Sequence, residues 1–228
     1  MSLLVQFNEE HAMLMKNKEV EAEIIQLINE ASELVKFDHV GLIQYLGSSS
    51  FFQDPASASH HLNVVGGLAR HTLSVYRETA KILDSQPEWA SGSDTLSNAY
   101  IILACIAHDF CKIGSYQIEK AWRKDDYGKW EEYERYNNKK LDFNPGHGVG
   151  SLLILNKFYK VPEQVAEAIL HHMGSFDGGN FTATDKARQA SFSYNPLAVA
   201  LHLGDMASSW MLESKVTKEM LEEIEKCD

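Results

Sequence analysis

The stretch that decides the fold is residues 95–114, TLSNAYIILACIAHDFCKIG, which is almost entirely apolar until it reaches His108. A helix that is apolar on all sides belongs in a protein interior, so we predict that residues 95–111 form the central helix of an all-α protein. His108 and Asp109 can both face one cavity from the helix end, because adjacent helical residues point about 100° apart. Lys112 follows one turn later over the same face. The helix end therefore combines an imidazole, a carboxylate that can bridge metal ions, and an ammonium that can hold a phosphate.

The rest of the chain is dominated by helical spacing of apolar residues, which begins with an amphipathic segment at 19–35. Further helices are predicted at 38–46, 60–84 (interrupted at Gly66–Gly67), 147–159, 162–173, 196–212 and 216–226. The segment 115–137 lacks this period and has aromatic residues on both sides of Asp-Asp-Tyr-Gly, which predicts a β-hairpin. The expected fold is an all-α bundle with a small hairpin insertion around 115–137. Residues 1–50 are expected to pack as helices on a globular unit that covers 51–228.

Composition narrows the class of protein. The chain has 228 residues, 44% hydrophobic and 23% charged, as in ordinary globular proteins. No apolar run approaches the ~18 residues of a membrane span, and residues 1–21 lack the features of a signal peptide. Three cysteines without a CxxC pattern indicate reduced thiols, so we expect a cytoplasmic protein with no membrane partner. The net charge of −11 argues against a general nucleic-acid binder.

Histidine and aspartate recur on five of the predicted helices, each at a helix end or on an apolar face. Neutral imidazole and carboxylate suit Mn, Fe, Co, Ni or Zn, and helix ends that converge inside a bundle can build such sites. The alternative for each residue alone is a solvated helix terminus or a buried polar side chain. The candidate metal ligands are His71, His108, Asp109, His147, His171, His172 and Asp205.

Two groups of residues allow more than one interpretation. Of the pair His171–His172, one can be a ligand while the other orients it, because ligating histidines need a partner. His61 lies too far before His71 on an unbroken helix, but a break at Gly66–Gly67 would fold it over the site as a substrate contact.

The hairpin aromatic residues allow two interpretations, whereas Cys111 has one. The hairpin aromatics either pack on the bundle or form a lid that stacks a nucleobase, with Arg123 and Lys124 near the phosphates. Cys111 lies inside the motif and, as one small apolar residue, is expected to pack.

The order of these motifs resembles that of a known superfamily. GGLARHT, AHDFCKIG and GDMAS follow one another as H…HD…D over residues 55–212, which is similar to the HD-domain metal-dependent phosphohydrolases. The resemblance implies that Asp109 bridges two metal ions and that Asp109 and Lys112 take part in catalysis. It assigns the first ion to His71, His108, Asp109 and Asp205, and the second to Asp109, His147 and one or both of His171 and His172.

The likeness is greatest to small stand-alone bacterial HD hydrolases, with similarities to HD-GYP phosphodiesterases and to the HD part of bacterial 3′–5′ exoribonucleases. The position of a third-metal ligand in some HD-GYP members is Gly67 here, so one or two ions are expected, with Mg as an alternative metal. The implied activity is hydrolysis of a phosphate ester, of a nucleotide or a related small phosphate, by metal-activated water. Lys112, His61, Arg123 and Lys124 are the expected substrate contacts. The alternatives are a 3′–5′ nuclease on single strands and a non-catalytic nucleotide-binding sensor.

Overall fold

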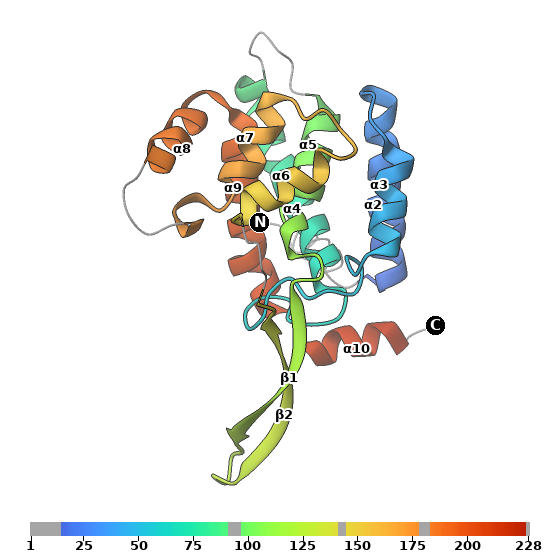
Figure 1. Ribbon diagram of the computed structural model, residues 1–228, viewed down its shortest axis with the longest axis vertical. Helices are drawn as coiled ribbons and strands as arrows, with labels where there is room; N and C mark the ends of the chain where they lie inside the picture. Colours follow the sequence, from blue (N-terminus) through green and yellow to red (C-terminus); the bar gives the residue numbers. More distant parts are fainter. Residues whose placement is uncertain (1–14, 91–96, 141–144, 178–182, 227–228) are drawn as a thin grey trace.

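The computed structural model describes residues 15–90, 97–140, 145–177 and 183–226 of the chain. These residues form a mostly helical body from which one two-stranded antiparallel sheet extends (Figure 1), as the sequence predicts. The longer helices are α2 (Asn17–Leu34), α3 (His39–Ser48), α4 (Gly67–Ser85), α5 (Asn98–Ala107), α6 (His147–Leu155), α7 (Glu163–His171), α8 (Ala183–Tyr194), α9 (Pro196–Ala207) and α10 (Lys218–Lys226). The strands are β1 (Tyr116–Lys124) and β2 (Trp130–Asn138), and short helical turns complete the body.

Helix α5 is the centre of the body, as its composition predicts. Its residues from Ile101 to Ala107 are all buried, and it contacts α2, α4 and α7. The Ser97 side chain accepts a hydrogen bond from the Ala99 N–H and so caps the first turn. The helix ends at Ala107, earlier than predicted, and a 3₁₀ turn, η2 (Phe110–Lys112), follows. The end of the most buried helix thus presents His108 and Asp109 inside the protein.

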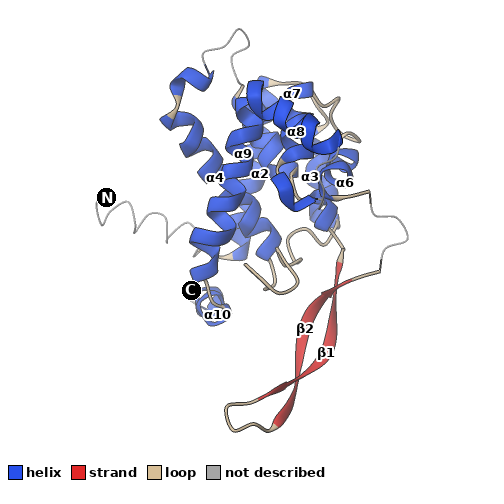
Figure 2. Cartoon of the chain, turned by 90° about the vertical axis from the view of Figure 1, so that its left-hand side faces the viewer, coloured by secondary structure: helices blue, strands red, loops and turns tan. Residues whose placement is uncertain are grey.

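The predicted hairpin is confirmed, with β1 paired to β2 from Tyr116↔Asn138 to Lys124↔Trp130. Gly128 has a φ of +77° in the connecting turn, a left-handed conformation that glycine adopts without strain. The hairpin projects from the helical body in both views (Figures 1 and 2).

The segment before α4 differs from the prediction. Residues 60–66 form turns rather than the first part of a helix, and α4 begins at Gly67. Gly66 has a φ of +76°, and a Cβ at Gly67 would lie 2.1 Å from the carbonyl oxygen of Leu62. The double glycine therefore turns the chain back tightly against itself. Helix α8 is a second difference, because no helix was predicted there.

One hydrophobic core joins the helices. Buried residues of α2 and α3, such as Ile24 and Leu42, belong to the same cluster as Leu103 of α5 and Leu201 of α9. A smaller cluster holds α10 through Leu221, which packs with Ala56 and Leu62. Within the described ranges, no helix has both the length and the apolar character needed to cross a membrane.

Candidate metal centre

Three helices bring imidazole and carboxylate groups to one buried point. His71 lies in the second turn of α4, His108 and Asp109 follow α5, and Asp205 lies near the end of α9. The Nε2 atom of His71 is 3.2 Å from His108 Nε2. It is also 3.4 Å from Asp109 Oδ2 and 3.4 Å from Asp205 Oδ1. The structure thus gathers, in one place, the four residues that the sequence suggests for the first ion.

Each of the buried histidines is oriented through its Nδ1 atom. Nδ1 of His71 lies 3.0 Å from Glu213 Oε1, and Nδ1 of His108 lies 2.6 Å from the Cys105 carbonyl oxygen. Nδ1 of His172 makes the same contact, at 2.7 Å, with the Ile169 carbonyl oxygen. Carboxylates and carbonyl oxygens only accept hydrogen bonds, so Nδ1 carries the proton in every case. In the neutral ring, this leaves the Nε2 lone pair free to bind a metal.

Asp109 is the residue that these histidines share. Its Oδ2 atom lies 3.4 Å from His108 Nε2 and 2.6 Å from Lys112 Nζ. Its Oδ1 atom faces the other way, 3.7 Å from His172 Nε2 and 3.9 Å from His147 Nδ1. The two oxygens of a single carboxylate therefore face two different groups of donors.

The charges around Asp109 displace the pKa values of the cluster. Burial alone would lower the pKa of His71, but Glu213 and Asp109 raise it to about 10. Burial outweighs the neighbouring carboxylate at His108, whose pKa is lowered. Burial alone would raise the pKa of Asp109, but Lys112 and the histidines hold it well below its usual range. The carboxylates therefore favour positively charged neighbours, and the protonated imidazole of His71 is one of them.

Two buried polar atoms that lack a hydrogen-bond partner in the described ranges indicate that a cation fits this cluster. Asp109 Oδ1 and His172 Nε2 are buried and, within the described part of the chain, have no hydrogen-bond partner. Their separation of 3.7 Å is too long for a hydrogen bond. A buried polar atom left unpaired costs about 1–3 kcal/mol, whereas a cation between these two atoms would satisfy both. The residues present therefore fit a metal ion, and the buried cluster of His and Asp side chains can hold one.

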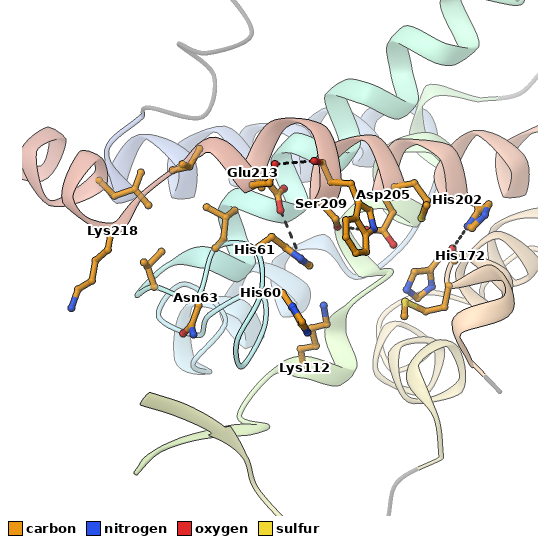
Figure 3. A pocket seen from close by; sticks show the side chains of 18 residues that line it. His60, His61, Asn63, Lys112, His172, His202, Asp205, Ser209, Glu213 and Lys218 are labelled. Carbon is orange, nitrogen blue, oxygen red and sulfur yellow. Dashed lines mark hydrogen bonds and ion pairs between the residues drawn. The ribbon is translucent and has the colours of Figure 1, made fainter. Parts of the chain in front are cut away.

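A cavity of about 750 Å³ opens beside the cluster (Figure 3). His61 lines it and stacks near His71 with ring centroids 4.9 Å apart, because the turn before α4 folds back. Burial lowers the pKa of His61 to about 4, so the ring is neutral at pH 7. Lys112 also lines the cavity and donates a hydrogen bond to the Ala56 carbonyl oxygen at 2.9 Å.

Other candidate residues lie apart from the cluster. Arg123 and Lys124 are on the projecting hairpin, where Arg123 pairs with Glu131 at 2.6 Å and Lys124 lies over the Trp130 ring. Trp130 is 59% exposed, and the hairpin that carries it projects from the helical body (Figure 1). Of the histidine pair, His172 directs its Nε2 toward Asp109, while the half-buried His171 ends α7.

Sequence reasoning did not identify two residues of the centre. Glu213 is 1% exposed and orients His71; it lies beyond the end of α9, in the 3₁₀ turn η5 (Glu213–Lys215). Cys111 was expected to pack, but its Sγ lies 3.5 Å from His147 Nδ1. Nothing in the sequence indicated that Glu213 lies against His71 or that the Cys111 thiol faces a histidine.

Comparison with known proteins adds no relative: no family model, no curated protein and no solved structure matches the chain.

Proposed function

We propose that this protein is a metal-dependent phosphohydrolase that acts on a nucleotide or a related small phosphate ester. The observation that carries the proposal is the convergence of His71 Nε2, His108 Nε2 and Asp109 on one point, with Lys112 beside them at the wall of a cavity. The order of the same residues in the sequence is similar to that of the HD-domain phosphohydrolases, which supports the same reading.

His71, His108, Asp109 and Asp205 would hold the first ion. A divalent ion in this position would polarise a phosphoryl oxygen and lower the pKa of a water molecule. Glu213 keeps the Nε2 atom of His71 directed at this point, and the Cys105 carbonyl does the same for His108.

Lys112 supplies positive charge where a phosphate would lie. Its ammonium touches Asp109 Oδ2 and lines the cavity, so it can contact a non-bridging phosphate oxygen next to the ligands. The neighbouring Asp109 carboxylate raises the pKa of Lys112 in spite of burial, so the group stays charged. His61, which is neutral and lies on the same cavity wall, can hydrogen-bond to the substrate without adding charge.

The cavity favours a small substrate with an aromatic or apolar part. Its volume of about 750 Å³ falls within the range of small-molecule sites, about 300–1,000 Å³. Met173, Met206 and Trp210 form part of its lining, and Trp210 is 65% exposed. An accessible indole beside a phosphate-binding lysine suits the stacking of a nucleobase.

The test is hydrolysis by protein purified without chelator. We expect release of phosphate or nucleoside monophosphate from members of a panel of nucleotides, cyclic dinucleotides and short RNAs, with Mn²⁺, Co²⁺, Ni²⁺ or Mg²⁺ added. Asp109→Asn keeps the shape of the side chain and should abolish turnover. Asp125→Asn, on the hairpin turn, is the matched control and should leave it unchanged.

Each result has a defined meaning. Turnover of short RNA in preference to nucleotides would replace the proposal with a nuclease. A nucleotide that binds and survives intact with metal present would indicate a sensor. Equal turnover by wild type and Asp109→Asn would refute the proposed centre.

A further inference from the structure

A second group of donors surrounds the Oδ1 atom of Asp109, on the side away from Lys112. His172 Nε2 and His147 Nδ1 lie 3.7 and 3.9 Å from this oxygen. Cys111 Sγ lies 3.5 Å from His147 Nδ1. The oxygen of Asp109, the sulfur of Cys111 and the nitrogen of His147 all lie within 4.8 Å of one another.

The distances between these donors are compatible with ligands of a metal ion. Metal–ligand bonds of about 2.0–2.3 Å place neighbouring tetrahedral ligands about 3.3–3.7 Å apart. The separations of 3.5, 3.7 and 3.9 Å agree with that range to within a few tenths of an ångström. The sulfur–nitrogen distance of 3.5 Å is that of a weak hydrogen bond, whereas 3.7 and 3.9 Å are too long for hydrogen bonds between nitrogen and oxygen. Asp109 Oδ1 and His172 Nε2 are buried without a hydrogen-bond partner among the described residues.

The position of Cys111 is fixed by its backbone and by its neighbour α6. The Cys111 N–H donates to Ser151 Oγ at 3.1 Å, and Ser115 Oγ donates to the Cys111 carbonyl at 2.7 Å. A Cβ at Gly150 would lie 3.0 Å from the Cβ of Cys111, so glycine is what lets α6 approach this closely. Since α6 begins at His147, the same close approach sets the distance between the thiol and the imidazole.

We propose that Cys111 is a ligand of a second metal ion, bound by Asp109 Oδ1, His147 Nδ1 and the Cys111 thiolate. The proposal rests on the metal centre of the proposed function and adds a sulfur ligand that the resemblance does not imply. Binding converts the Cys111 thiol to a thiolate, forms a metal–sulfur bond and releases one proton to solvent. Thiolate is a soft ligand, so this position selects Zn²⁺ or Co²⁺ over Mg²⁺ and Mn²⁺.

Cobalt is the probe, because a thiolate bound to Co²⁺ gives a charge-transfer band in the near ultraviolet. The experiment uses the full chain with Cys105→Ala and Cys227→Ser, so that Cys111 is the only thiol. We expect two equivalents of Co²⁺ to bind and the band to develop with one of them. Adding Cys111→Ser should remove the band and lower the affinity for that Co²⁺ at least tenfold. Loss of a residue that only orients a ligand already lowers metal affinity about 10- to 100-fold. The other equivalent should bind as before.

Alkylation of Cys111 provides a second readout that needs no substitution at this residue. We expect Co²⁺ or Zn²⁺ to slow its reaction with iodoacetamide at least tenfold, and Mg²⁺ to leave the rate unchanged. A band that persists in Cys111→Ser, or full Co²⁺ occupancy without a band or thiol protection, would overturn the proposal. The band without any hydrolysis would refute the proposed function alone, and hydrolysis with two ions and no band would refute the sulfur ligand alone.

Discussion

Glu213 offers the sharpest perturbation of the proposed metal centre, because it contacts the proposed ligand His71 at Nδ1 rather than at Nε2. The side chain is buried, and its Oε1 and Oε2 atoms lie 3.0 and 3.1 Å from His71 Nδ1. Removing it frees the His71 ring to rotate and makes Nε2 less basic. Loss of such an orienting partner typically lowers metal affinity 10- to 100-fold, or about 1.4–2.7 kcal/mol.

Two substitutions bracket this magnitude. Glu213→Gln keeps an acceptor for Nδ1–H and should lose about tenfold, whereas Glu213→Ala keeps none and should approach 100-fold. Glu222→Gln on α10 is the control, because its side chain is 53% exposed and should leave affinity unchanged. Affinity is measured by competition for Co²⁺ with a chromophoric chelator, with circular dichroism as the check on folding. If both Glu213 variants fold and bind Co²⁺ within about twofold of wild type, the orienting role is refuted.

Three further predictions concern the cavity and the core. Lys112→Met should lower kcat/KM about 10²- to 10³-fold, because it removes a positive charge next to the phosphate. Lys120→Met on the hairpin is the control and should leave kcat/KM unchanged. Equal losses in the two variants would contradict the role of Lys112. Trp210→Ala should raise KM for a nucleotide about 5- to 150-fold but leave KM for ribose 5-phosphate unchanged, which initial rates on both substrates measure. Burial raises the pKa of the Cys105 thiol to about 12. At pH 8 only about one thiol in 10⁴ is therefore ionised in the folded protein, so in Cys111→Ser/Cys227→Ser protein iodoacetamide should label Cys105 only after unfolding, and rapid native labelling would disprove this.

The sequence predicted those parts of the molecule that local pattern determines. The continuous apolar run of α5 predicts burial whatever its neighbours are, and the loss of the helical period at residue 115 predicts the hairpin. The candidates His71, His108, Asp109 and Asp205 were recognisable because their order along the chain resembles a known pattern, and the structure brings these four together.

The remaining features depend on long-range packing. Glu213 is an acid in a polar stretch, and only the course of the chain after α9 shows that it lies under His71. Cys111 faces His147 because Gly150 allows α6 to approach, which is a property of two elements and not of either one. The hairpin's aromatic residues allowed either packing on the bundle or a lid, and the sequence could not decide because the direction in which a hairpin projects is set by the body that carries it. Residues 60–66 were predicted as helix, whereas they form turns, and α4 begins only at Gly67, after the left-handed Gly66.

The most direct test of the central claim is anomalous diffraction from crystals grown with Co²⁺ or Zn²⁺. We expect a peak about 2.0–2.2 Å from His71 Nε2, His108 Nε2, Asp109 Oδ2 and Asp205 Oδ1, and its loss in Asp109→Asn. Crystals soaked in saturating metal that show no peak among these four atoms would refute the proposed metal centre.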